Sequence, residues 1–125
     1  MKPDECTVHV ALEDASTSLQ LTRANWKAFR DIARLRMKSG LEVIPGMIGC
    51  PDLAQATAEL KADPATRSSL RRAGISPTEY LQIGWALLVA NDPELFNVRS
   101  NPVVTSNAAF IARHRVEVDS LLRGR

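Results

Sequence analysis

The most apolar stretch of the chain is Tyr80–Ala90, eleven residues that contain a single strongly polar side chain. A helix that is apolar on all sides belongs inside a bundle and not on its surface. Just before it, Ser76 and Glu79 have the spacing of a capping box, in which each side chain accepts a hydrogen bond from the other residue's backbone N–H. Pro77 stands at the first helical position, where its missing N–H is no loss. The pattern therefore predicts a central buried helix over about 77–91.

Apolar residues three and four positions apart predict further amphipathic helices. These cover about residues 22–39, 52–62, 64–73 and 105–122. Thr22 and Asp63 stand where helix N-caps are expected, while Gly40 and Gly74 stand where helices often end in a left-handed residue. We expect residues 97–105 to form a loop before one continuous last helix.

Two segments lack helical periodicity. Residues 1–21 are expected to form an extended arm that packs on the helices, and residues 40–51, with three glycines and two prolines, an ordered and partly buried loop. A chain of 125 residues suggests one domain that is long enough to bury a core. The predicted fold class is all-α: a single-domain bundle of about five helices around the buried one, with a helical core over 22–123.

The predicted helix over 22–39 carries a basic face. Six basic residues stand against one acidic residue between Arg23 and Lys38. Five of the basic residues recur at helical spacing: Arg23, Lys27, Arg30, Arg34 and Lys38. Such a stripe suits the phosphates of nucleic acid or an anionic surface. Trp26 and Phe29 lie on the opposite, core-facing side, so stacking on bases is not supported.

A second interpretation of this face is a solvated surface whose charge is balanced by acidic residues elsewhere. Candidates are Glu59, Asp63, Asp4 and Glu5. Exposed ion pairs of that kind are common and contribute little stability. The chain has a net charge of only +2, which by itself does not indicate a nucleic-acid partner.

His114 lies four residues after Phe110 and four before Val118, so on a continuous helix it shares their apolar face. It is either an acid–base group of an enzyme or a histidine at the edge of the core. No metal-ligand spacing accompanies it, so we predict no metal and no cofactor. Trp85 follows Gly84 in the central helix, and that glycine indicates either close helix packing or room for a ligand beside the indole.

The two cysteines, Cys6 and Cys50, bear on the compartment. An even cysteine count in an exported protein favours a disulfide, and the alternative is two unrelated buried thiols. The first residues lack the apolar stretch of a signal peptide, which leaves a mature exported domain and a cytoplasmic protein as the two expectations. No apolar run is long enough to span a bilayer. The expected partner is a protein or a small-molecule ligand, and nucleic acid is a less favoured alternative.

Two motifs carry a resemblance to known proteins. The helix start Ala73–Tyr80 and the last-helix pattern Asn107–Glu117 resemble those of a family of small, mostly uncharacterised bacterial proteins that are often made with export signals. The motifs are helix caps and packing positions, so the resemblance carries over no catalytic residue. It implies a periplasmic or otherwise exported helical domain, and it favours the pairing of Cys6 with Cys50.

The residues and the resemblance together lead us to expect a non-enzymatic helical binding or interaction domain of an exported bacterial protein. One alternative is polyanion or nucleic-acid binding through the basic face of the 22–39 helix. The other is an enzyme that uses His114.

Overall fold

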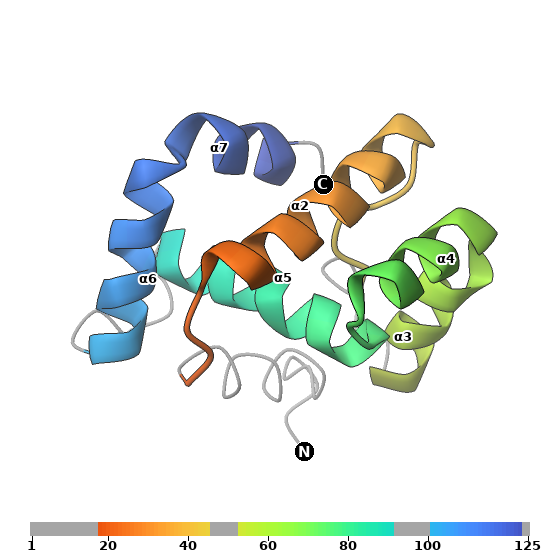
Figure 1. The fold of residues 1–125 in the computed structure, drawn as a ribbon, viewed down its shortest axis with the longest axis horizontal. Coiled ribbons are helices and arrows are strands. Elements are labelled where there is room, and N and C mark those ends of the chain that lie inside the picture. Colours follow the sequence, from red (N-terminus) through yellow and green to blue (C-terminus); the bar gives the residue numbers. More distant parts are fainter. Residues whose placement is uncertain (1–17, 46–52, 92–100, 124–125) are drawn as a thin grey trace, which may run out of the picture.

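The computed structural model describes residues 18–45, 53–91 and 101–123 (Figure 1). Over these residues the fold is all-α, as the sequence predicts, and contains no strand. The helices are α2 (Arg23–Lys38), α3 (Leu53–Ala62), α4 (Pro64–Ala73), α5 (Pro77–Asn91), α6 (Pro102–Arg113) and α7 (Arg115–Arg123). The expected extended arm lies outside the described residues except for residues 18–21.

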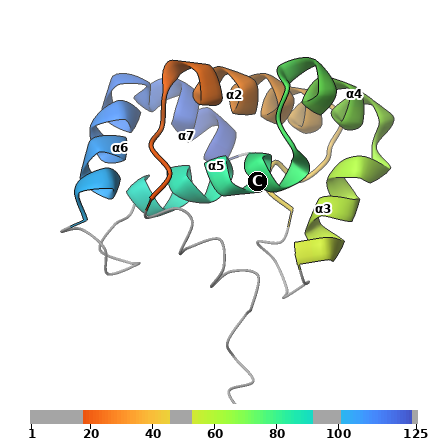
Figure 2. The ribbon, with the colours of Figure 1, turned by 60° about the horizontal axis from the view of Figure 1, so that its bottom comes forward.

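Helix α5 runs through the middle of the bundle (Figures 1 and 2). Helix α2 crosses one side of it, α3 and α4 gather at its first turns, α6 lies at its end, and α7 runs back from α6 towards α2. Ser76 Oγ accepts from Glu79 N–H at 3.1 Å, and Glu79 Oε1 accepts from Ser76 N–H at 3.0 Å, so the predicted capping box is confirmed. Every residue of Tyr80–Ala90 except Gln82 is buried, as expected for a helix that is apolar on all sides.

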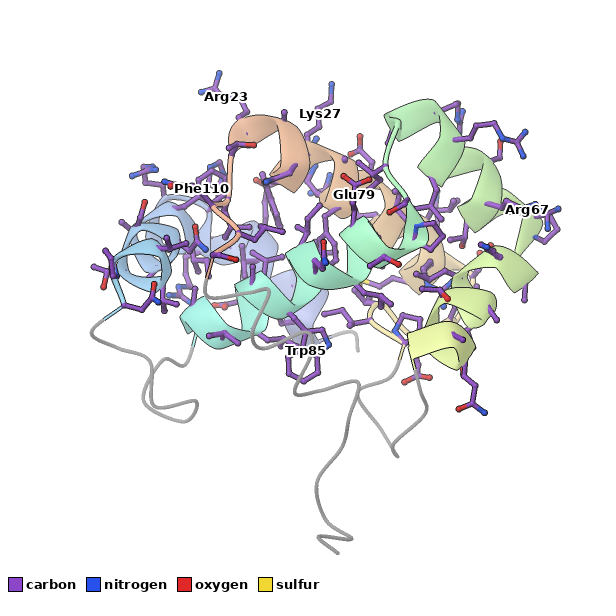
Figure 3. All side chains as sticks on the ribbon, turned by 90° about the horizontal axis from the view of Figure 1, so that it is seen from below. Arg23, Lys27, Arg67, Glu79, Trp85 and Phe110 are labelled. Carbon is purple, nitrogen blue, oxygen red and sulfur yellow. The ribbon has the colours of Figure 1, made fainter. Side chains whose placement is uncertain are left out.

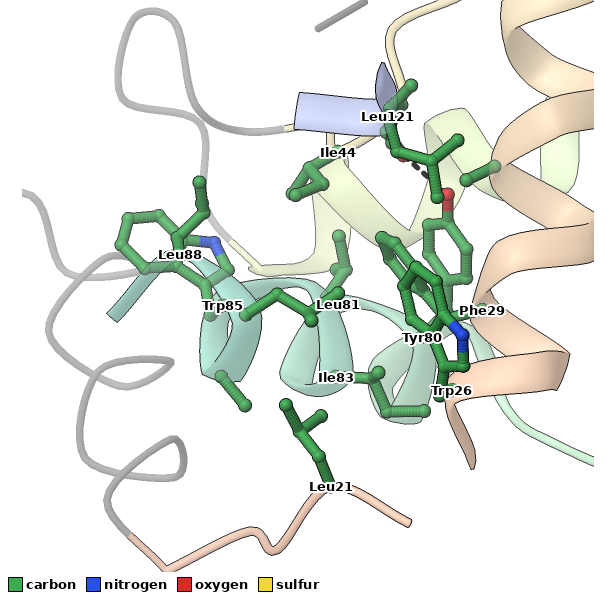
Figure 4. Packing of buried hydrophobic residues seen from close by; sticks show 14 of the residues in the cluster. Leu21, Trp26, Phe29, Ile44, Tyr80, Leu81, Ile83, Trp85, Leu88 and Leu121 are labelled. Carbon is green, nitrogen blue, oxygen red and sulfur yellow. Dashed lines mark hydrogen bonds between the residues drawn. The ribbon is translucent and has the colours of Figure 1, made fainter. Parts of the chain in front are cut away.

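Aromatic and aliphatic side chains of α2 and α5 pack together in the core (Figure 4). The Phe29 and Tyr80 rings stack with their centroids 4.7 Å apart. A Cβ added at Gly84 would lie 3.0 Å from Ile44 Cδ1 and 3.1 Å from Phe29 Cε2. Gly84 therefore serves close packing against α2 and the segment that follows it. Tyr80 donates its hydroxyl hydrogen to the Val43 carbonyl at 2.6 Å, which holds that segment over the helix.

Four predicted helix ends are confirmed, both ends of α2 and both ends of α4. Thr22 caps α2 by accepting from Asn25 N–H at 3.1 Å, and Gly40 follows that helix with a φ of 72°. Asp63 caps α4, and Gly74 ends it with a φ of 73°. Both glycines adopt the left-handed conformation that they tolerate without a Cβ penalty.

The carboxyl-terminal region differs from the sequence prediction in two ways. Helix α6 begins at Pro102, not near residue 105, because Asn101 Oδ1 accepts from Val103 N–H at 2.9 Å and from Val104 N–H at 3.1 Å. The expected single helix also breaks at His114, which has a φ of −122° and a ψ of 27°. The chain turns there, and α7 folds back towards α2 (Figure 1). A straight helix would carry the apolar residues of α7 away from the core, whereas the turn buries them.

Asn107 joins α6 to the residues before α2. Its Oδ1 accepts from Leu21 N–H at 2.8 Å, and its Nδ2 donates to the Leu19 carbonyl at 2.8 Å. Asn107 is only 1% exposed, and these bonds satisfy both ends of its amide. The last residues of the expected arm therefore do pack on the helices.

Candidate binding surface

The basic face predicted on α2 is present and points away from the bundle. Arg23, Lys27, Arg34 and Lys38 are exposed, and Arg30 is partly buried. Figure 3 shows Arg23 and Lys27 projecting from α2 on the side opposite Trp85. Trp26 and Phe29 lie in the core with exposures of 2% and 0%, which confirms their predicted orientation.

Two acidic residues balance part of this face. Glu117 Oε2 lies 2.9 Å from Arg34 Nη2 and 3.5 Å from Arg30 Nη1, and Asp31 Oδ1 lies 3.2 Å from Arg30 Nε. Asp63, named from the sequence as a counter-charge, instead caps α4. Among the residues that the structure describes, no ion pair engages Arg23, Lys27 or Lys38.

Two grooves run beside the exposed face of α2. One, of about 540 Å³, lies between α2 and α4, and it is lined by Ala24, Lys27, Ala28, Asp31, Ile32, Ser69, Arg72 and Ala73. The other, of about 610 Å³, lies between α2 and α7, and it is lined by Asp31, Arg34, Leu35, Met37, Lys38, Ser120 and Leu121. Asp31 of α2 lines both grooves, so they lie on either side of the exposed face of this helix. Their volumes fall within the range of ordinary ligand sites.

The sequence pattern did not reveal these grooves. The one available signal is that Leu35 follows Arg34 at the border between the basic and apolar faces of α2. The groove itself is formed by two helices far apart in the sequence, so periodicity within one helix cannot predict it.

Arg36 belongs to α2 but not to its exposed face. It is 3% exposed, and it donates from Nε to the Glu42 carbonyl at 2.6 Å and from Nη1 to Thr66 Oγ1 at 3.2 Å. Thr66 in turn donates its hydroxyl hydrogen to Asp63 Oδ2 at 2.7 Å. The hydroxyl and the backbone N–H of Thr66 hold the pKa of the Asp63 carboxyl below its ordinary value. This network joins the end of α2 to the start of α4 and leaves one cation fewer on the surface.

His114 lies at the corner between α6 and α7. Its ring stacks on Phe110 with centroids 4.5 Å apart, and the Trp26 ring lies 5.9 Å away. The Glu117 carboxylate lies beside it, with Oε1 3.7 Å from His114 Nδ1. His114 lines neither groove, and the carboxylate beside it already pairs with Arg30 and Arg34. The corner thus brings His114 together with two of the predicted basic residues, in an arrangement that holds α7 on α2.

Trp85 is 5% exposed and lines neither groove. Its indole lies in the part of the core around the later turns of α5, near Leu88 (Figure 4). The interpretation of Gly84 as a place for close packing fits this burial better than a ligand site beside the indole. Trp85 therefore contributes to the core of the described structure.

The remaining predicted features concern metals, membranes and the disulfide. Within the described ranges no three His, Cys, Asp or Glu side chains gather in a way that could hold a metal ion. None of the described helices has the length and apolarity needed to cross a bilayer. Cys6 and Cys50 lie outside the described residues. No protein-family model, curated protein or solved structure matches this chain.

Proposed function

We propose that this chain is a non-enzymatic helical binding domain that recognises an acidic protein partner through the exposed face of α2. The observation that carries this proposal is the combination on one helix of unpaired cations with a groove on each side. Lys27 and Lys38 stand at the borders of the two grooves, and neither has an ionic partner among the described residues. Charged rims steer partners and select among them, while grooves supply contact area.

Nucleic acid fits this surface less well than an acidic protein. Single-stranded nucleic acid is bound largely by stacking on aromatic side chains, and both aromatic residues of α2 are buried. Asp31 and Glu117 stand among the cations and would repel a continuous row of phosphates. A face of mixed charge is better matched by a protein, which can place single acidic side chains opposite single cations.

An enzymatic role for His114 has weaker support. A general base needs a reacting group within hydrogen-bond reach in an accessible site. The Glu117 Oε1 atom lies 3.7 Å from His114 Nδ1, beyond hydrogen-bond reach, and it belongs to a carboxylate that is shared with two arginines. The stacking of His114 on Phe110 accounts for its position without any catalytic function.

Export from a bacterial cell, with a disulfide between Cys6 and Cys50, is part of the proposal. It is supported by the even cysteine count and by the resemblance of Ala73–Tyr80 and Asn107–Glu117 to proteins that are often exported. A thiol titration of the denatured, non-reduced protein purified from an oxidising compartment is expected to find no reactive cysteine. Two reactive thiols under these conditions would refute the disulfide.

The binding proposal is tested with fluorescein-labelled poly-L-glutamate, measured by anisotropy at low and high salt. We expect binding that weakens as salt rises, because exposed charges are screened. Lys27→Glu is expected to weaken it several-fold, since it reverses a cation on the α2 face. Lys61→Glu is the matched control, because it makes the same charge change on an exposed residue of α3.

Three results would contradict the binding proposal. One is the absence of binding to poly-L-glutamate by the wild-type protein. Another is an equal loss of affinity in Lys27→Glu and Lys61→Glu, which would mean that only net charge matters. Tighter, strongly salt-dependent binding of duplex DNA in parallel experiments would favour the nucleic-acid alternative instead.

A further inference from the structure

The groove between α2 and α7 has an aliphatic floor and a cationic rim. Leu121 is buried, and Leu35 and Met37 are partly buried, so the floor lies below the surrounding surface. Arg34 and Lys38 are exposed at its rim. This groove of about 610 Å³ is named the α2–α7 groove below.

The ion pairs of Glu117 determine where this groove begins. They fix the first turn of α7 on α2 through Arg34 at 2.9 Å and Arg30 at 3.5 Å. Ser120 and Leu121, about one turn further along α7, line the α2–α7 groove. Glu117 partly neutralises Arg34, the rim residue closest to it. Lys38, at the end of α2, has no ion pair among the described residues.

We propose that the α2–α7 groove docks an amphipathic segment of a partner protein, with an aliphatic side chain on the floor and acidic side chains against Arg34 and Lys38. This inference rests on the proposed function and specifies the site and the chemistry of the partner. Helices that bind in grooves present apolar anchors three, four and seven residues apart, with polar residues alongside. Met37 suits such a floor, because its flexible thioether adapts to different anchors.

Charge complementarity selects an acidic segment. The lining of the groove contains two cations and one anion. Lys38 has no ion pair among the described residues, Arg34 is exposed although Glu117 partly neutralises it, and the anion Asp31 pairs with Arg30. A partner with acidic residues at both cationic positions gains two attractive contacts, while a neutral or basic residue opposite Asp31 avoids repulsion. A basic partner would meet like charge at two positions, which disfavours it.

A membrane surface fits the α2–α7 groove poorly. Interfacial binding requires apolar side chains that project into the lipid, and the floor residues here are recessed. Val116, 84% exposed, is the one strongly exposed large apolar side chain of the described residues, and it lines neither groove. A single valine provides little apolar area for insertion.

The test uses a fluorescein-labelled helical peptide with leucines at i, i+3 and i+7 and glutamates on both flanks. A second peptide has alanines in place of the leucines and the same charge. We expect the leucine peptide to bind the full-length chain at least about tenfold more tightly, since interface affinity is concentrated in buried anchors. Anionic vesicles and duplex DNA are offered as the other classes of partner.

Two pairs of variants test the location of the site. Ser120→Trp fills the groove without a change of charge, and Ser68→Trp makes the same substitution at an exposed position of α4. Lys38→Glu and Lys61→Glu both reverse a lysine in the last turn of a helix, so they perturb helix-end electrostatics alike. We expect a loss of about tenfold from Ser120→Trp and Lys38→Glu, and less than about twofold from their controls.

Equal affinity of the leucine and alanine peptides would overturn the inference, and so would full binding by Ser120→Trp. Preference for vesicles or DNA over the leucine peptide would do the same. These failures are distinct from failure of the proposed function. If poly-L-glutamate binding depends on Lys27 while Ser120→Trp leaves peptide binding unchanged, the acidic partner is supported and the assignment of the α2–α7 groove is refuted.

Discussion

The substitution Tyr80→Phe removes one oxygen atom from the centre of the core. Tyr80 is fully buried, and its hydroxyl donates to the Val43 carbonyl at 2.6 Å. Val43 is also fully buried, so no solvent is available to replace the lost donor. The ring of phenylalanine preserves the stacking on Phe29, where the centroids are 4.7 Å apart. The variant thus isolates the hydrogen bond that holds residues 43–45 over α5.

The expected loss in the free energy of unfolding is about 1–3 kcal/mol, the usual cost of leaving a buried polar group unsatisfied. A full cavity is not formed, because only a hydroxyl is removed, so the larger penalties of Leu→Ala changes do not apply. For a domain of this length, 1 kcal/mol corresponds to about 4 °C in Tm, and the expected decrease is about 4–12 °C.

Urea unfolding followed by circular dichroism measures this loss at constant temperature. The slope of the transition should match that of the wild type, since the same surface is exposed on unfolding. A decrease of less than about 0.5 kcal/mol would refute the reasoning, because it would mean that the Val43 carbonyl finds another partner at no cost. A changed slope would show that the variant has a different native or denatured state.

Three further predictions follow from single residues of the described structure. Leu87→Ala, at a position that is 1% exposed, should lower the free energy of unfolding by about 2–5 kcal/mol, whereas Val116→Ala should change it by less than about 0.5 kcal/mol in the same urea assay. Asn107→Ala removes the acceptor of the Leu21 N–H and the donor to the Leu19 carbonyl, so it should lower the free energy of unfolding by about 1–3 kcal/mol. It should also speed hydrogen exchange at the Leu21 amide, and unchanged exchange would refute the role of Asn107. Burial raises the pKa of Tyr80 above its ordinary value, so its contribution to stability is complete below about pH 10 and falls as pH rises further. Tyr80 is the only tyrosine, so its phenolate absorbance should appear together with unfolding, and the advantage of the wild type over Tyr80→Phe should shrink above about pH 10.

The sequence predicted the helices well wherever a helix end depends on neighbouring residues. The box of Ser76 and Glu79 and the caps at Thr22 and Asp63 all form through contacts three residues apart. The start of α6 at Pro102 was missed because Asn-Pro is also a common turn signal, although Asn101 caps the helix through an equally local bond. The continuous apolar pattern through His114 concealed the turn between α6 and α7.

The candidate site was only half predictable. Periodicity correctly separated the cations of α2 from Trp26 and Phe29. It could not show that Arg36 is buried, since the groups that bind it belong to Glu42 and Thr66. Nor could it show that Glu117, more than eighty positions away, neutralises Arg30 and Arg34.

The sequence by itself determined an all-α chain, the limits of α2, α4 and α5, and the burial of α5. These follow from caps, glycines and apolar periodicity, which act over a few residues. The tertiary structure alone decided which cations of α2 remain unpaired among the described residues and where the grooves lie. The physical reason is that charge neutralisation and groove shape depend on residues brought together from distant parts of the chain. The turn at His114 is decisive, because it lays α7 against α2 and so creates both the Glu117 ion pairs and the α2–α7 groove.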